Sequence, residues 1–122
     1  MKQQTVLNEV SFSGIGIHSG KNSNIKIYPA KENTGIVFQR VDLDKQPKIK
    51  AVFSNVVTTN RSTNIKKDKA EVHTIEHLMA SIYSLEIDNL LITIDNIEVP
   101  ILDGSSKEIT VLLKKSGIKS EI

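Results

Sequence analysis

Helical periodicity is confined to two short segments of this chain, and this restricts the folds that it can adopt. Apolar residues are spaced i, i+3, i+4 and i+7 from Ile75 to Ile82, and a second helical pattern follows Ser105. The rest of the first ninety residues is expected to be mainly strands, and Asn24–Tyr28 alternates polar residues with apolar ones as a half-buried strand does. This order of elements predicts an α+β fold: a two-layer sandwich with two helices on one face of a mainly antiparallel sheet.

The expected strands are short and bounded by turn residues. They cover Val6–Phe12, Asn24–Tyr28, Ile36–Arg40, Ile49–Phe53, a hairpin over Asn64–Val72, and Asp88–Asp95. Thr74 is the expected N-cap of the first helix, which ends near Leu85. The second helix is expected to open with a capping box of Ser105 and Glu108 and to stop at Gly117. The polar tail is expected to begin an interdomain linker.

Length and composition favour some classes of protein over others. The 122 residues fit one domain, so residues 1–122 are expected to form a single unit. The 16 basic and 14 acidic residues are scattered, so binding to nucleic acid is not expected. The chain has no cysteine, so a zinc ion would need His, Asp or Glu ligands. The absence of a long apolar run predicts a cytoplasmic protein without membrane insertion.

Residues His73 to His77 spell H-x-x-E-H, the pattern of one class of zinc proteases. In that class both histidines lie on one helical face, four residues apart, and bind the same metal. Thr74 is the best N-cap in this segment, and the residues before it continue the preceding strand. His73 is therefore predicted to lie outside the helix, as an ordinary strand or surface histidine, and the protease interpretation is disfavoured.

Glu76 and His77 are left at the start of the predicted helix, and both point away from its apolar face. The positive end of a helix dipole favours an ionised carboxylate, which suits a general base. The simpler interpretation is that Glu76 complements the dipole and that His77 is exposed. The two residues by themselves leave both interpretations open.

Further motifs flank this pair. They are Gly14–Gly20, Asn33-Thr34-Gly35-Ile36, Arg61-Ser62-Thr63, Ile87-Asp88-Asn89 and Pro100–Ser105. Together with Thr74–Leu78 they closely resemble UDP-3-O-acyl-N-acetylglucosamine deacetylase, a family of zinc hydrolases that commits Gram-negative bacteria to lipid A biosynthesis. The resemblance runs from Gln4 to about Gly117. The expected layered arrangement also resembles the ribosomal S5 domain 2-like type of fold.

The resemblance implies roles for four residues. Glu76 corresponds to the general base and His77 to a ligand of Zn²⁺. In this family zinc and the glutamate activate a water that attacks the acetamide carbonyl of UDP-3-O-acyl-N-acetylglucosamine, which releases acetate and leaves a 2-amino group. His18 and Ser62 match positions that line the substrate site. A turn role for His18 and a plain loop role for Ser62 stay open, and Asp103-Gly104 is interpreted as a structural turn.

The resemblance covers only the N-terminal half of the family. The absent C-terminal half supplies the other zinc ligands from an H-K-x-x-D motif, an acid histidine and the passage for the acyl chain. No histidine follows His77 in this sequence, so the isolated chain is expected to be inactive. It is expected to work with a C-terminal deacetylase domain, in cis or in trans. The alternative is a non-catalytic binding or interaction module of the same fold.

Overall fold

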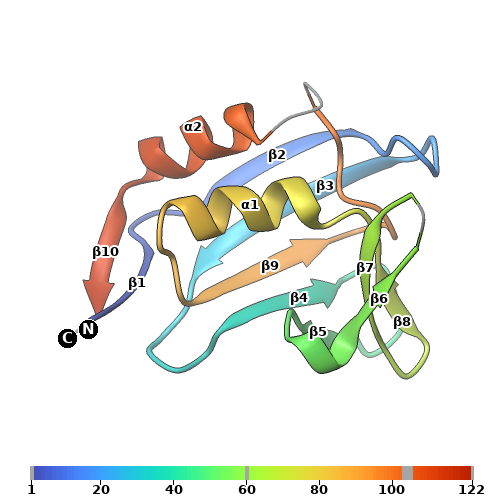
Figure 1. Cartoon of the computed structure of the whole chain (residues 1–122), viewed down its shortest axis with the longest axis horizontal. Coiled ribbons are helices and arrows are strands. Elements are labelled where there is room, and N and C mark those ends of the chain that lie inside the picture. The colour runs from blue at the N-terminus through green and yellow to red at the C-terminus, as the bar shows by residue number, and fades with distance from the viewer. Residues whose placement is uncertain (1, 60, 103–105, 122) are drawn as a thin grey trace.

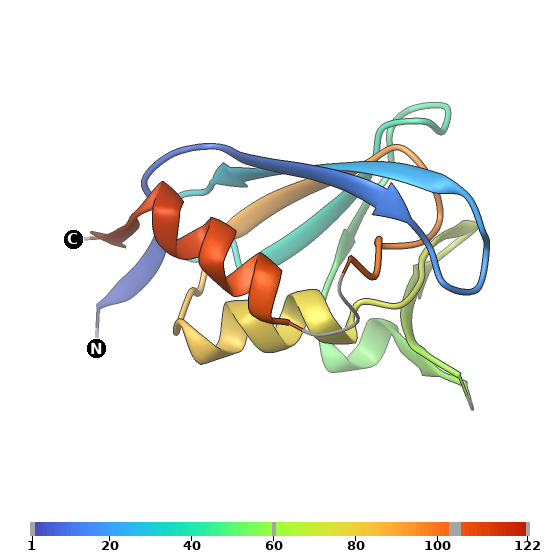
Figure 2. The ribbon, with the colours of Figure 1, turned by 90° about the horizontal axis from the view of Figure 1, so that it is seen from above.

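The computed structural model of the chain describes residues 2–59, 61–102 and 106–121. Two α-helices lie against mostly antiparallel sheets, and the elements follow one another as Figure 1 shows. Figure 2 shows the largest sheet as the upper layer and both helices as the lower layer. The predicted α+β, two-layer architecture is confirmed.

The largest sheet has five strands in the order β2-β3-β9-β4-β5. Neighbouring strands are antiparallel except β4 and β9, which run parallel. The bounds are β2 Val10–Ile15, β3 Asn22–Pro29, β9 Leu90–Ile94, β4 Ile36–Arg40 and β5 Lys48–Lys50. A second sheet pairs β1 with β10, and a third has the order β6-β7-β8. These strands are β1 Gln3–Val6, β10 Ile118–Glu121, β6 Val56–Thr58, β7 Thr63–Lys67 and β8 Ala70–Val72.

The helices α1 (Glu76–Ser84) and α2 (Lys107–Ser116) lie side by side below the five-stranded sheet (Figure 2). Polar side chains join them: the Ser81 hydroxyl donates to the Ser106 carbonyl at 2.8 Å, and the Thr110 hydroxyl lies 3.0 Å from Ser81 Oγ. Ser81 is fully buried, so these bonds satisfy a hydroxyl that would otherwise be costly to bury.

Alternation along the central strands produces the layer of apolar side chains between the sheet and the helices. In β3, Ile25 and Ile27 are fully buried whereas Asn24 and Lys26 are exposed, as a strand with one covered face requires. The helices contribute the inward side of their apolar stripes. Fully or almost fully buried members of the core include Ile25, Ile27, Phe38, Leu78, Ile82, Ile92, Ile94, Ile109 and Leu113.

Asn89 fastens several strands together. Its Oδ1 accepts the Gly35 N–H at 2.8 Å, and its Nδ2 donates to Gln3 Oε1 at 2.8 Å. Its carbonyl oxygen accepts the Thr5 hydroxyl at 2.6 Å. Asn89 is 1% exposed, and these partners satisfy its buried polar atoms. The two family motifs that contain Gly35 and Asn89 therefore hold β4 and β9 in place.

Several boundaries differ from the sequence prediction. The expected first strand is divided into β1 and β2 by a bend at residues 7–9, where Leu7 is 57% exposed. The strand expected over Ile49–Phe53 is reduced to β5, and Phe53–Asn55 form a 3-10 helix, η1. Both strands were predicted too long because Leu7 and Phe53 are apolar, although in the structure neither side chain reaches the core.

The sequence did not predict β6 or β10. The prediction that the tail begins a linker is wrong for Ile118–Glu121, which pairs with β1 from Val6↔Ile118 to Gln3↔Glu121. This strand carries a single apolar residue, so it has no alternating apolar pattern. Its order comes from the backbone ladder to β1.

Burial of α1 gives a prediction about stability. We expect Leu78→Ala to lower the free energy of unfolding by about 2–5 kcal/mol, because Leu78 is fully buried and its truncation leaves a cavity. Tyr83→Ala on the same helix should change it by less than about 0.5 kcal/mol, since Tyr83 is 83% exposed. Denaturant unfolding followed by circular dichroism compares the two variants. Equal losses would mean that the buried face of α1 is assigned incorrectly.

Candidate active site

The segment between β8 and α1 determines how the two neighbouring histidines are placed. His73 lies in this segment, outside the helix, as predicted. Its backbone forms an isolated parallel bridge with Glu98, and its ring Nε2 lies 3.2 Å from Glu71 Oε1. His73 and His77 therefore do not share a helical face, and the H-x-x-E-H string lacks the geometry of a zinc-protease pair.

Thr74 does not cap α1, so that part of the sequence prediction is wrong. Ile75 occupies the N-cap position in helical conformation, and no described side chain caps the helix there. Thr74 has a φ of 60°, which is rare for a β-branched residue. Its hydroxyl donates to Glu98 Oε2 at 2.6 Å, and its N–H donates to Asn64 Oδ1 at 3.0 Å. The hydroxyl is thus taken up by a buried carboxylate and does not reach the helix N–H groups.

Glu76 is the first residue of α1, and its two carboxylate oxygens differ in their surroundings. Oε2 accepts the Thr63 N–H at 3.3 Å. Oε1 is buried and has no hydrogen-bond partner among the described residues. Leaving a buried acceptor unpaired costs free energy, and this oxygen is available to accept a further hydrogen bond.

His77 occupies the next position of α1. Its imidazole is half-buried, so the simpler expectation that it is exposed is wrong, and no described residue hydrogen-bonds to the ring. The described residues contain no group of three or more His, Cys, Asp or Glu that could hold a metal ion. An imidazole that makes no hydrogen bond to a described residue has a ring nitrogen available to coordinate a metal ion.

His18 and Ser62 come from distant parts of the sequence and meet at one cavity of about 390 Å³. Its walls are formed by His18, Thr59, Arg61, Ser62, Asn64 and His73. His18 Nε2 lies 3.3 Å from the Arg61 carbonyl oxygen, and the Ser62 hydroxyl donates to Asn64 Oδ1 at 2.8 Å. The structure therefore brings the two predicted substrate residues together.

The cavity and the start of α1 are connected through Thr63. This residue follows Ser62 in the chain, and its N–H is the group that holds Glu76. Glu76 and His77 do not line the cavity themselves. His73, which the sequence set aside, is one of its wall residues. The predicted base therefore lies next to the predicted substrate residues along the backbone of β7.

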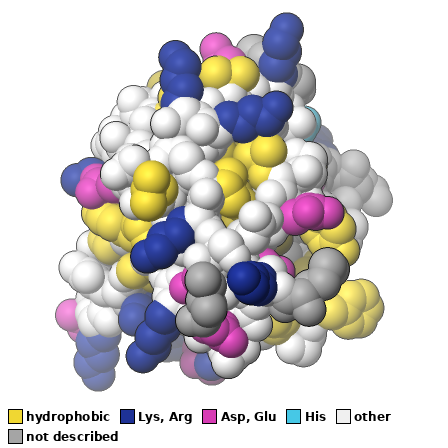
Figure 3. All heavy atoms as spheres, turned by 90° about the vertical axis from the view of Figure 1, so that its left-hand side faces the viewer, with side chains coloured by type: hydrophobic (Ala, Val, Ile, Leu, Met, Phe, Trp, Pro, Cys, Tyr) yellow, Lys and Arg dark blue, Asp and Glu magenta, His cyan; other side chains and the backbone are white. Residues whose placement is uncertain are grey.

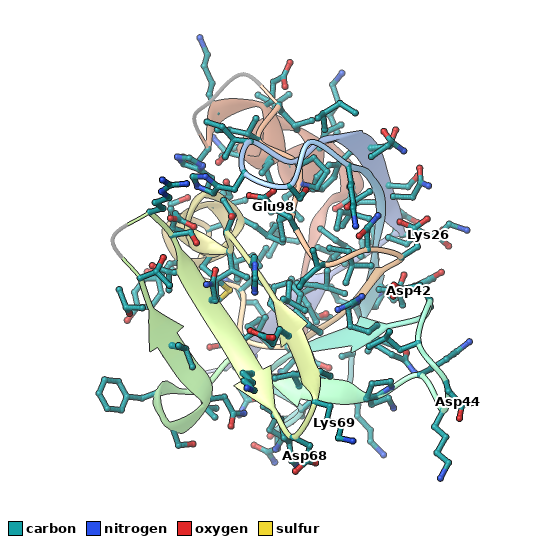
Figure 4. All side chains as sticks on the ribbon, turned by 90° about the vertical axis from the view of Figure 1, so that its right-hand side faces the viewer. Lys26, Asp42, Asp44, Asp68, Lys69 and Glu98 are labelled. Atoms are coloured by element: carbon teal, nitrogen blue, oxygen red, sulfur yellow. The ribbon has the colours of Figure 1, made fainter. Side chains whose placement is uncertain are left out.

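Glu98 is a residue that the sequence prediction missed. It is 1% exposed, and its carboxylate accepts hydrogen bonds from the Ser19 N–H at 2.7 Å, from the His18 N–H and from the Thr74 hydroxyl. In Figure 4 it lies beneath the loop that joins β2 and β3. The available signal was an acidic residue between the apolar residues Ile97 and Val99.

The surroundings of Glu98 change the acidity of its carboxyl group. Burial raises the pKa of Glu98. Hydrogen bonds from Thr74, Ser19 and His18 together lower it by more than burial raises it, so the pKa lies below the ordinary value of 4.5. A group whose pKa is lowered by folding stabilises the folded state above its unfolded pKa. That contribution is lost as the pH falls through the folded pKa.

We therefore expect the difference in free energy of unfolding between the wild type and Glu98→Gln to be larger at about pH 7 than at about pH 3. Asp42 also has a lowered pKa, through its hydrogen bonds to Arg40, but this group is present in both proteins and cancels. Glu9→Gln, at an exposed position, should show no such trend. Urea titrations at a series of pH values measure the difference, and a value independent of pH would contradict the assignment.

Asp103, Gly104 and Ser105 fall outside the described residues, so the predicted turn and capping box are not tested. Asp68 and Lys69, at the tip of the β7–β8 hairpin, lie far from Glu98 in Figure 4. On the side of the molecule that holds the chain ends, basic and acidic side chains are interspersed (Figure 3). Among the described helices, none has the length and apolar character needed to cross a membrane.

Comparison with known proteins agrees with the resemblance seen in the sequence. The family model described as LpxC: UDP-3-O-acyl N-acetylglycosamine deacetylase matches residues 3–122. A curated UDP-3-O-acyl-N-acetylglucosamine deacetylase from Geobacter sp. (strain M21) is 50% identical over 117 residues, which is 96% of this chain and 38% of the relative. One of the same name from Lawsonia intracellularis is 44% identical over 119 residues, which is 98% of this chain and 39% of the relative.

The chain thus spans less than two fifths of the length of these curated relatives and corresponds to their N-terminal part. The family model nevertheless extends over nearly all of its residues. Among the described residues, motifs that carry the resemblance lie at the starts of β4, β9 and α1 and in the wall of the cavity. The chain therefore belongs to the UDP-3-O-acyl N-acetylglycosamine deacetylase (LpxC) family.

Proposed function

We propose that residues 1–122 form the N-terminal domain of a cytoplasmic, zinc-dependent deacetylase in lipid A biosynthesis. The complete enzyme hydrolyses the 2-acetamido group of UDP-3-O-acyl-N-acetylglucosamine to a free amine and acetate. The observation that carries the proposal is the buried, unpartnered Oε1 of Glu76 at the start of α1, in a chain of this family.

Glu76 is the general base in this proposal. The Thr63 N–H binds Oε2 and so fixes the orientation of the carboxylate. Oε1 is then the atom that accepts a proton from water, because no described group competes for it. The first turn of a helix also favours negative charge at this position.

His77 is the ligand that this chain offers to Zn²⁺. Its half-buried ring has no hydrogen bond to a described residue, so a ring nitrogen can coordinate without breaking an existing contact. Zinc, when bound, polarises the acetamide carbonyl and makes water more acidic. A catalytic zinc site has three protein ligands, so the others must come from the rest of the protein.

His18 and Ser62 contact the substrate in this proposal. Both line the cavity that adjoins Thr63, and their imidazole and hydroxyl groups can hydrogen-bond to a polar sugar nucleotide. Completion of the site needs a C-terminal deacetylase domain, supplied in cis or in trans. The isolated 122-residue chain is then inactive.

The test is to incubate the full-length protein that contains this chain with UDP-3-O-acyl-N-acetylglucosamine, and to measure acetate release and bound metal. We expect acetate release that stops when a chelator removes the metal and returns when zinc is added. A protein that binds no zinc and releases no acetate would instead be the non-catalytic binding module.

A further inference from the structure

Glu98 receives hydrogen bonds from two segments that are far apart in the sequence. From the β2–β3 loop, the His18 N–H lies 3.1 and 3.2 Å from its two oxygens, and the Ser19 N–H lies 2.7 Å from Oε1. From the segment before α1, the Thr74 hydroxyl lies 2.6 Å from Oε2. The Glu98 backbone is held as well, because its carbonyl oxygen accepts the Ser23 hydroxyl at 2.7 Å. The carboxylate therefore joins the loop to the helix start.

The β2–β3 loop is folded closely around this carboxylate. A Cβ atom added to Gly16 would collide with Glu98 Oε1, so only glycine lets the loop backbone approach this closely. The loop is closed by two backbone bonds: the Gly16 N–H donates to the Lys21 carbonyl at 3.0 Å, and the Gly20 N–H donates to the Gly16 carbonyl at 3.0 Å. The position of His18 in the cavity wall thus depends on a loop that folds around the Glu98 carboxylate.

Thr74 needs the carboxylate for a different reason. Its φ of 60° is unfavourable for a β-branched side chain, and such a conformation persists only where the surroundings enforce it. Two contacts do so: Asn64 Oδ1 holds the N–H of Thr74, and Glu98 Oε2 holds its hydroxyl. Both acceptor side chains, Asn64 and Glu98, are buried, so water does not substitute for them easily.

The direction in which α1 begins follows from Thr74. No described side chain caps the helix, and the Ile75 N–H donates to the Thr63 carbonyl at 3.0 Å. Glu76 then returns a bond to the same residue, because its Oε2 accepts the Thr63 N–H. A change in the backbone at Thr74 would rotate or shift this start, and with it Glu76 and His77.

We propose that Glu98 is a positioning residue for the site. It holds the His18 loop and the strained Thr74 against each other, so that His18, Glu76 and His77 keep fixed relative positions. The expected effect of Glu98 on kcat rests on the proposed function, whereas its effect on the local structure does not. Glu98 contacts none of the proposed reacting groups directly, since its partners are backbone N–H groups and the Thr74 hydroxyl.

Glu98→Gln isolates this role. Every partner of the carboxylate is a donor, and an amide replaces one of its two acceptor oxygens with a further donor. One of the two segments therefore loses its anchor, although the volume of the side chain is preserved. Glu9→Gln makes the same chemical change at an exposed position and serves as the control.

The experiment measures both consequences in the full-length protein. Hydrogen exchange followed by mass spectrometry should show at least about tenfold faster exchange in residues 16–20 and 74–79 of Glu98→Gln, and no change elsewhere or in Glu9→Gln. With UDP-3-O-acyl-N-acetylglucosamine as substrate, kcat should fall about 10- to 100-fold.

A second background distinguishes positioning from general stability. Glycine adopts a φ of 60° without strain and has no hydroxyl, so in a Thr74→Gly protein the helix start makes no bond to Glu98. In this background, the fold loss of kcat that Glu98→Gln causes should be at least about five times smaller than in the wild-type background. Uniformly faster exchange, unchanged exchange, or a kcat within about twofold of the Glu9→Gln protein would overturn the proposal. If the unmutated protein releases no acetate, the proposed function fails, and the exchange result still decides the role of Glu98.

Discussion

Glu76→Gln in the full-length protein is expected to lower kcat by about 10²- to 10⁴-fold while the zinc content stays at the wild-type level. Glutamine keeps the shape of the side chain, and its carbonyl oxygen can still accept the Thr63 N–H. It cannot take a proton from water, which is the step assigned to the buried Oε1. Steady-state acetate release at saturating substrate measures kcat, and elemental analysis of the same sample measures zinc.

The control for this variant is Glu86→Gln. Glu86 is exposed beyond the opposite end of α1, so the same change of charge there should leave kcat within about twofold of the wild type. Loss of activity in both variants would indicate an effect of net charge. If Glu76→Gln alone retained wild-type kcat, Glu76 would not be the base, and the binding-module alternative would gain support.

His77→Ala should act on the metal and not on the proton transfer. Removal of a ligand is expected to lower the affinity for zinc by more than about 100-fold, since even loss of a group that only supports a ligand costs about 10- to 100-fold. Competition with a fluorescent zinc chelator measures the affinity. Activity should return partly at high zinc concentration, which separates this variant from Glu76→Gln.

His73→Ala is the matched control for the metal. It removes the other imidazole of the H-x-x-E-H string, whose ring interacts with Glu71 and lies outside α1. We expect its zinc affinity to stay within about threefold of the wild type. Equal losses of zinc affinity in the two histidine variants would mean that both rings bind one metal. That result would contradict the placement of His73 outside α1.

The parts of the fold that the sequence predicted are those with a strong local signal. The buried spacing of Ile75, Leu78 and Ile82 predicted α1, and the alternation in Asn24–Tyr28 predicted β3. Placement of His73 outside the helix was also correct. For α1 and β3, the pattern of burial in the structure repeats the pattern of apolar residues in the sequence.

The details of the site depend on contacts that no local pattern contains. Thr74 was assigned as a helix cap because its hydroxyl suits that role, but in the structure the hydroxyl donates to the Glu98 carboxylate and does not cap the helix. The importance of Glu98 could not be predicted, since its donors lie at residues 18, 19 and 74. β10 was missed for a related reason, because its partner β1 lies at the other end of the sequence.

The place of β9 in the sheet has a consequence for the order of folding during synthesis. β3 and β4 follow one another in the sequence, yet each hydrogen-bonds to β9, which lies between them. A nascent chain that ends before residue 90 already contains Glu76 and His77 but lacks the strand that joins the two parts of the sheet. Glu76 and His77 are therefore synthesised before the strand that completes the sheet above them, and we expect them to reach their final positions only after residues 90–94 have left the ribosome.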